Sequence, residues 1–280
     1  MRLATIATPA GPRLHVRGRS GYVDVGEETG DPGLASLAAL LRAGPATLEA
    51  VRALSGRDGR EYGPADLGPA VPAPERILCL GVNYREHAIE GGREVPTWPE
   101  AFVRGRDSVL APYADLVKPA LTDRFDFEGE LGIVIGSGGR YIPADKALDA
   151  IAGFVVVNDA SAREWQRAGT QWTAGKNFEG SMPIGPEVVT ADEADVTDVA
   201  LTTVLNGQVM QSARTSQMIV DVPSAVEFFS SFTRLQPGDV IATDTPAGVG
   251  MPRGEFLKPG DEVRIEIAGC GVLTNPVVSG

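Results

Sequence analysis

Apolar and polar positions at the start of the chain alternate as they do in strands. RLHVRG and GYVDVG show this alternation, and GRSG between them is typical of a turn. Helical spacing follows in LASLAALLRA and in the shorter VRALSG. The next stretch, GREYGPADLGPAVPAPE, is rich in Gly and Pro and is typical of a linker. This pattern predicts a small N-terminal α+β domain over residues 1–72 and a main domain over residues 73–280.

Short apolar runs dominate the rest of the chain. They are rich in Val and Ile and are separated by turn signals: RILCLG, LGIVIG, IAGFVVVND, VALTTVLNG, DVIATDT and EVRIEIAG. One clear helix is expected over residues 222–232, where Pro223 suits the first turn. Because long helices do not separate the strands, the pattern predicts a β-rich mixed α+β core rather than a doubly wound parallel sheet.

Charge and composition narrow the classes of function. Twenty-five basic side chains against 37 acidic ones leave a formal charge of −12, which opposes binding to nucleic acid or to an anionic membrane. A small anionic substrate would need a local cation. No run approaches the roughly 20 apolar residues that span a bilayer, and Pro9 and Pro12 interrupt the N-terminus where a signal peptide would be apolar. With only two cysteines, a soluble cytoplasmic protein is expected.

Carboxylates gather around one strand, in FDFEGELGIVIG. Asp126, Glu128 and Glu130 occupy alternate positions and would share one face, which is either a solvated face or a cation site. Gly129 leaves the backbone between the two glutamates unhindered. Asp159 directly follows the apolar strand GFVVVN, where its carboxylate could serve either as a metal ligand or as the N-cap of a helix. Three acidic oxygen ligands without a Cys or His cluster suit Mg²⁺ or Mn²⁺. The predicted ligands are Glu128, Glu130 and Asp159.

The chain has two histidines, and only one has a partner that suggests chemistry. His15 lies in an alternating strand and is expected at the surface. His87 lies three residues before Glu90, so a helical turn would place the carboxylate beside the imidazole, as a general base requires. Such a pair is also common on plain surfaces. Gly91 and Gly92 would let this turn move as a lid.

Two loops offer groups that could bind a carboxylate. GKNFEGSMPIGP contains Lys176, and TDTPAGVG is a Thr- and Gly-rich loop directly after the strand DVIA. Neither loop matches a Walker or Rossmann pattern, which argues against a nucleotide ligand.

Taken together, and in the order in which they occur along the chain, these segments resemble the fumarylacetoacetate hydrolase family. The resemblance covers nearly all of residues 76–278 and rests on GVNYREHAIE, FDFEGELGIVIG, GFVVVNDASAREWQ, QWTAGKNFEG, LNGQVMQSARTSQMIVDVP, LQPGDVIATDTPAGVG and LKPGDEVRIEIAGCGVLTNPV. It implies mixed β-sheets rolled into a barrel-like arrangement, a small N-terminal α+β domain and a homodimer. It also implies a divalent cation held by the three predicted ligands.

The same resemblance implies roles for individual residues. His87 and Glu90 would form a catalytic dyad on a short lid helix, with Lys176 as a further catalytic group. The residues implied to contact substrate are Tyr84, Arg104, Arg163, Gln166 and Thr245. Two positions depart from the family pattern. Arg104 stands where relatives carry Lys, and Asp244 stands where the loop usually has Gly, which favours a less anionic substrate.

The activity implied is hydrolysis of a carbon–carbon bond in a β-diketo acid, such as an acylpyruvate of aromatic catabolism. His87 would activate water while the metal stabilises an enolate leaving group. The alternatives are decarboxylation of an oxaloacetate-like 2-oxo acid or isomerisation of a hydroxymuconate-type acid on the same site. A non-catalytic metal- or ligand-binding protein is a further alternative.

Overall fold

The computed structural model describes residues 1–280 and has a mixed α+β fold dominated by sheets. The β-rich mixed α+β class predicted from the pattern is confirmed. The strands are β1 (Arg2–Thr8), β2 (Gly11–Arg17), β3 (Tyr22–Asp24), β4 (Ile77–Gly81), β5 (Glu100–Arg104), β6 (Val109–Leu110), β7 (Leu116–Lys118), β8 (Phe125–Asp126), β9 (Gly129–Ile135), β10 (Ile151–Asn158), β11 (Ser161–Ala162), β12 (Met182–Thr190), β13 (Ala200–Leu205), β14 (Gln208–Arg214), β15 (Val240–Ala242), β16 (Glu262–Ile267) and β17 (Gly271–Ser279).

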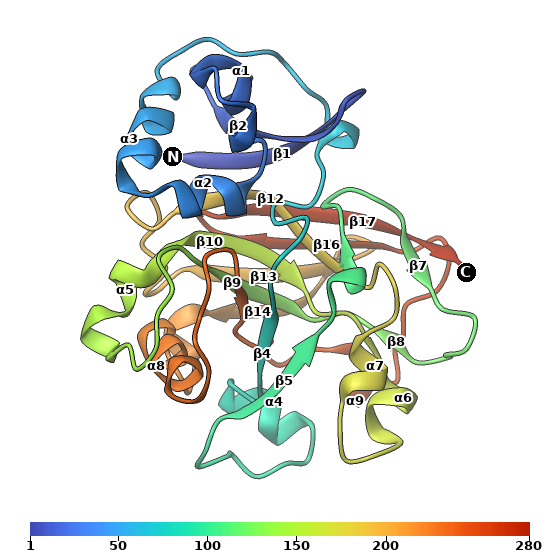
Figure 1. Ribbon diagram of the computed structural model, residues 1–280. Coiled ribbons are helices and arrows are strands. Elements are labelled where there is room, and N and C mark those ends of the chain that lie inside the picture. The colour runs from blue at the N-terminus through green and yellow to red at the C-terminus, as the bar shows by residue number, and fades with distance from the viewer.

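The helices are short, and they cluster at the two ends of the molecule and along one side (Figure 1). They are α1 (Val25–Thr29), α2 (Leu37–Ala43), α3 (Pro45–Leu54), α4 (Arg85–Glu90), α5 (Ala147–Ala150), α6 (Arg163–Arg167), α7 (Thr173–Lys176), α8 (Val222–Phe232) and α9 (Gly250–Arg253), with 3₁₀ turns at η1 (Pro32–Leu34), η2 (Pro64–Asp66), η3 (Arg106–Ser108), η4 (Ala144–Lys146) and η5 (Thr215–Gln217). Helix α8 has the predicted bounds, because Asp221 caps it and Pro223 fits its first turn. No helix has both the length and the apolar character to cross a membrane.

Two large open sheets pack face to face. The ten-stranded sheet has the order β3-β2-β1-β12-β10-β9-β15-β4-β5, with β6 beside β12, and the five-stranded sheet has the order β14-β13-β16-β17-β7. Strands β10 and β12 of the first sheet lie against β16 and β17 of the second. Apolar side chains from both sheets fill the space between them, among them Phe154, Val156, Ile265 and Leu273. A small third sheet pairs β8 with β11.

The N-terminal strands extend the large sheet. Strand β1 pairs antiparallel with β12, with Arg2 opposite Val189. Leu3 and Leu40 lie in one apolar cluster with Val155 of β10, so residues near the N-terminus share a core with the later strands. The division at residue 72 stays a prediction. The expectation that His15 lies at the surface is wrong: the side chain is buried, and the ring of Tyr62 packs edge-on against it. Helices α1 to α3 cover this end of the molecule (Figure 1).

The strand expected over residues 125–136 is in fact two strands. Asp126 ends β8, which pairs with β11, and β9 begins only at Gly129. Asp126 therefore does not share a strand face with Glu128 and Glu130. Its carboxylate is fully buried and accepts hydrogen bonds from the backbone N–H of Gly250 at 2.8 Å and from Arg163 Nε at 2.8 Å.

Candidate active site and metal centre

Strand directions bring the acidic residues to one edge of the large sheet. Strands β4 and β15 run parallel, and β9 lies antiparallel to both β15 and β10. The start of β9 therefore meets the ends of β10 and β15. Glu130 is paired with Val157, and the Asp159 N–H donates to the Glu128 carbonyl at 2.8 Å. Because opposed residues share a face, the predicted ligands come together there.

Glu128, Glu130 and Asp159 form a buried cluster of carboxylates. Each offers one ligand oxygen, and these oxygens lie within 4.8 Å of one another. Glu128 Oε1 lies 2.5 Å from Arg163 Nη1, and Lys176 Nζ lies 2.5 Å from both Glu128 Oε2 and Asp159 Oδ2. Burial by itself raises the pKa of Glu128, but Arg163 and Lys176 outweigh it and lower that pKa to about 2.

Glu130 lacks such cations. Its Oε2 accepts a hydrogen bond of 3.1 Å from the Asp244 N–H, and its buried Oε1 has no partner. Burial, Asp159 and Asp244 raise the pKa of Glu130 well above its ordinary value. An unpaired carboxylate oxygen beside two other carboxylates is a position that a cation would stabilise.

The charges and donor types fit a divalent cation. The buried carboxylates at this edge are Asp126, Glu128, Glu130, Asp159 and Asp244, and the buried cations among them are Arg104, Arg163 and Lys176. Carboxylates thus outnumber cations at this edge, and a bound cation would stabilise their ionised forms. Oxygen ligands alone suit a hard ion such as Mg²⁺ or Mn²⁺.

Gly129 allows the two glutamates to lie close to the second sheet. A Cβ added at Gly129 would lie 2.3 Å from Thr203 Oγ1, so no larger residue fits without movement. Gln211 accepts a hydrogen bond of 3.1 Å from the Gly129 N–H and donates one of 2.7 Å to Thr245 Oγ1. Thr245 in turn donates to the Gly129 carbonyl at 2.9 Å. These bonds fix the backbone between the two predicted ligands.

His87 and Glu90 lie on helix α4, so the predicted helical turn is present, and its role as a lid stays a prediction. His87 Nδ1 lies 2.8 Å from Glu90 Oε1, and Glu90 Oε2 accepts a hydrogen bond of 2.9 Å from the Gly248 N–H. Burial lowers the pKa of His87, but Glu90, Asp244 and Glu128 outweigh it and raise that pKa above 6.5. Since a carboxylate only accepts, Nδ1 carries a proton and the other ring nitrogen is left for chemistry.

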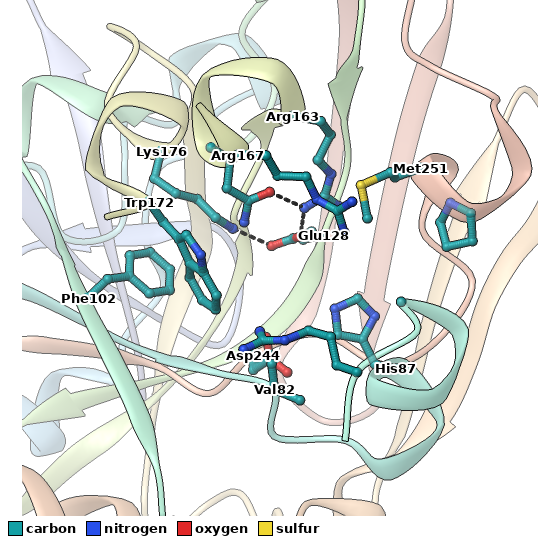
Figure 2. Close-up of a pocket in the computed structure, with 14 residues that line it drawn as sticks. Val82, His87, Phe102, Glu128, Arg163, Arg167, Trp172, Lys176, Asp244 and Met251 are labelled. Carbon is teal, nitrogen blue, oxygen red and sulfur yellow. Dashed lines mark hydrogen bonds and ion pairs between the residues drawn. The ribbon is translucent and has the colours of Figure 1, made fainter. Parts of the chain in front are cut away.

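A cavity of about 160 Å³ joins the dyad to the carboxylate cluster. Its wall includes His87, Glu128, Arg163, Arg167, Lys176 and Asp244. Figure 2 shows Lys176, Arg163 and Arg167 along one side, His87 and Asp244 along the opposite side, and Glu128 between them. The helices α4, α6, α7 and α9 that carry much of this wall lie at the end of the molecule remote from α1 to α3 (Figure 1).

The predicted site residues fall into two groups. His87, Glu128, Arg163, Gln166 and Lys176 line the cavity. Beneath or beside it lie Glu90, Glu130, Asp159, Tyr84, Arg104 and Thr245, which are not part of its wall. Their predicted roles stay predictions.

Three residues expected to meet substrate do not line the cavity. Arg104 is buried and donates to Asp159 Oδ1, to the Ala160 carbonyl at 3.2 Å and to Ser181 Oγ at 2.5 Å. Its guanidinium therefore supports a predicted ligand rather than facing the cavity. Thr245 is held by Gln211, and the buried Tyr84 hydroxyl has no hydrogen-bond partner.

Other residues that shape the site were missed by sequence reasoning. Trp172 forms part of the cavity wall and packs edge-on against Phe102, with ring centroids 5.4 Å apart. Asn83 donates to the Val220 and Thr243 carbonyls, both at 2.9 Å, and Gln211 holds Gly129. Trp172 stands four residues before Lys176, and this spacing could have indicated that the two side chains lie near one another. Gln211 contacts Gly129 from 82 residues further along the chain, and no local pattern indicated this contact.

Known proteins resemble this chain in sequence and in fold. A model of the fumarylacetoacetate (FAA) hydrolase C-terminal domain matches residues 76–278. The chain is 37% identical over 288 residues to the mitochondrial oxaloacetate tautomerase FAHD2A of Bos taurus, covering 99% of this chain and 92% of that protein. It resembles the crystal structure of 5-carboxymethyl-2-hydroxymuconate delta-isomerase from Mycobacterium smegmatis, at 34% identity and a TM-score of 0.79 over all of both chains.

A further solved relative contains a metal. Maleylpyruvate hydrolase from Sphingobium sp. SYK-6, solved in complex with manganese(II) and pyruvate, is 28% identical, with a TM-score of 0.83 over all of both chains. Tautomerase, isomerase and hydrolase names thus all occur among these relatives. As its motifs predicted, the chain belongs to the fumarylacetoacetate hydrolase family and is an enzyme of that family.

Proposed function

We propose that this enzyme moves a proton on the carbon next to the 2-oxo group of a small oxo acid, interconverting the keto and enol forms of an oxaloacetate-like substrate. The observation that carries the proposal is the position of His87. Its Nδ1 is held by Glu90 while its ring forms part of the wall of the cavity that also contains Glu128. One proton-transfer group thus faces the carboxylate cluster. The tautomerase relative at 37% identity over 99% of the chain supports this choice.

A divalent cation held by Glu128, Glu130 and Asp159 would supply Lewis-acid stabilisation of negative charge on the 2-oxo oxygen. His87 takes a proton from the carbon through the ring nitrogen that does not face Glu90 and returns it to the oxygen of the resulting enolate, which gives the enol form. The same two transfers in reverse convert the enol into the keto form. Glu90 keeps the ring in one orientation and stabilises its protonated form. The raised pKa of His87 suits a group that must donate as well as accept.

Cations on the opposite wall complete the proposed site. Lys176 and Arg163 line the cavity on the side facing His87 (Figure 2). Both carry buried positive charge that developing negative charge on the substrate would meet. We propose a small anionic oxo acid as the substrate and Mg²⁺ or Mn²⁺ as the metal, with Trp172 and Phe102 limiting the entry of water.

Hydrolysis of a β-diketo acid, the activity expected from the sequence, is the second candidate. It needs the same groups, with His87 activating a water instead of deprotonating carbon. The maleylpyruvate hydrolase relative with manganese and pyruvate favours it. Decarboxylation of an oxaloacetate-like acid remains within the same chemistry, because it also passes through an enolate.

Purified protein with Mg²⁺ or Mn²⁺ should be assayed against enol-oxaloacetate, acylpyruvates and hydroxymuconates. We expect faster ketonisation of enol-oxaloacetate, and a loss of about 100-fold or more in kcat for His87→Gln, with unchanged metal affinity by calorimetry. Cleavage of acylpyruvates without ketonisation would replace the proposal by the second candidate. Unchanged ketonisation in His87→Gln would remove the dyad from the mechanism.

We also propose that the enzyme is a homodimer, as the family resemblance implies. Light scattering on the purified protein should give a mass twice the 29.4 kDa of one chain. A mass of one chain would overturn this proposal without affecting the chemistry above.

A further inference from the structure

Arg167 differs from the other cations of the cavity wall. Arg163 pairs with Asp126 and Glu128, Lys176 pairs with Glu128 and Asp159, and Arg93 pairs with Glu100 at 2.5 Å. No ion pair or hydrogen bond joins the Arg167 side chain to the rest of the chain. In a protein with a formal charge of −12, a cavity cation without an acidic partner is available to a ligand.

The backbone that carries Arg167 is firmly anchored. Arg163 and Arg167 are four residues apart on α6, so they share one face of the helix, and both line the cavity. Glu164 ties the helix to Thr122 and to the Asp123 N–H, and Trp165 Nε1 donates to the Leu121 carbonyl at 3.0 Å. The Arg167 guanidinium thus extends from a helix whose position is fixed by these bonds.

Helix α7 packs closely against helix α6. A Cβ added at Gly175 would lie 2.3 Å from the Gln166 backbone nitrogen, so the two helices touch through backbone. Lys176, the next residue, reaches the carboxylate cluster from α7. The position of α6, which carries Arg167, relative to the predicted metal site is therefore set by this backbone contact and by the ion pairs of Lys176.

The two sides of the cavity differ in charge. Arg167 lies on the side of Arg163 and Lys176, whereas Asp244 lies opposite, beside His87 (Figure 2). A substrate bound by its 2-oxo acid end at the carboxylate cluster would meet a carboxylate if it extended toward Asp244. It would meet an unpaired guanidinium if it extended toward Arg167, and guanidinium groups bind carboxylates by paired hydrogen bonds.

We propose that Arg167 binds the distal carboxylate of the oxaloacetate-like substrate and so sets this enzyme's preference for a 2-oxo acid that carries a second carboxylate. This inference rests on the proposed function, because it places the 2-oxo acid end at the cluster of Glu128, Glu130 and Asp159. It opposes the less anionic substrate that Asp244 suggested in the sequence, since the distal charge is directed away from Asp244.

Binding of two stable ligands tests the subsite apart from turnover. In 2-oxoglutarate a distal carboxylate stands where 2-oxopentanoate has a methyl group, and both have the same 2-oxo acid end. Calorimetry on the Mg²⁺-loaded enzyme should give tighter binding of 2-oxoglutarate. In Arg167→Gln this preference should fall by about tenfold, with 2-oxopentanoate affinity unchanged. Arg167→Lys should retain part of it, because the charge remains.

Arg140→Gln is the matched control, since Arg140 is exposed and lies outside the cavity wall. It should leave both affinities unchanged. Equal losses for both ligands in Arg167→Gln, or no preference for 2-oxoglutarate in the wild type, would overturn the subsite. If the wild type binds 2-oxoglutarate through Arg167 but does not ketonise oxaloacetate, the proposed function fails and the subsite stands.

Discussion

The Asp244 carboxylate accepts a hydrogen bond of 2.6 Å from the backbone N–H of Asn83, which joins the end of β15 to the segment before helix α4, the predicted lid. Asp244 has φ +73°, and Val82, the residue before Asn83, has φ +57°. A left-handed β-branched residue is strained and persists only where its surroundings hold it. The Asp244 N–H also donates to Glu130, so one residue links the lid to a predicted metal ligand.

Removing this carboxylate should loosen the lid. Asp244→Gly accepts the positive φ without strain but leaves the buried Asn83 N–H unpaired, which costs about 1–3 kcal/mol. Hydrogen exchange of the amides from Asn83 to Glu90 should then be about tenfold faster. Asp244→Asn keeps an acceptor oxygen and should retain protection. Equal protection in both variants would show that the side chain does not hold the lid.

Glu128 and Glu130 should respond differently to neutralisation. Glu128→Gln leaves Arg163 and Lys176 short of a buried partner and should destabilise the metal-free protein by about 3–5 kcal/mol. Glu130→Gln removes an unpaired buried carboxylate and should leave the metal-free protein as stable as the wild type or more so. Both variants should lose Mg²⁺ affinity and activity. Thermal unfolding with and without metal separates these effects, and retained metal affinity in Glu130→Gln would remove it as a ligand.

The His87–Glu90 pair should stabilise the fold in a pH-dependent way. The pKa of His87 is raised in the folded protein, so the stabilisation is fully present below 6.5 and is lost as pH rises through the raised pKa. The free energy of unfolding of wild type minus that of His87→Gln should therefore be largest at about pH 5.5 and shrink toward about pH 9. A difference that grows with pH would contradict the raised pKa.

Gly129→Ala should disturb the metal centre through packing alone. The added Cβ would lie 2.3 Å from Thr203 Oγ1, and crowding of this kind typically costs about 1–3 kcal/mol. We expect a lower melting temperature and weaker Mg²⁺ binding. The double variant Gly129→Ala, Thr203→Ala removes the clashing hydroxyl and should recover part of both. No recovery would place the defect in the backbone rather than in this contact.

Local patterns were enough for several elements. The continuous Val- and Ile-rich runs predicted β9, β10 and β16, and α8 was predicted with its bounds because its cap and its proline are adjacent in sequence. Other features depended on partners far along the chain. The break between Asp126 and Gly129 arises because β8 pairs with β11 instead of continuing the large sheet.

The sequence by itself determined the β-rich class, the residues able to bind a divalent cation and the His87–Glu90 pair, because alternation and i, i+3 spacing are local properties. Only the tertiary structure decided how these groups are used. Glu130 is unpaired while Glu128 has two cations, Arg104 supports Asp159 instead of facing the cavity, and Arg167 is free while Arg163 is not. Each of these facts depends on charges brought together by strand pairing and helix packing over tens of residues, which spacing along the chain does not encode.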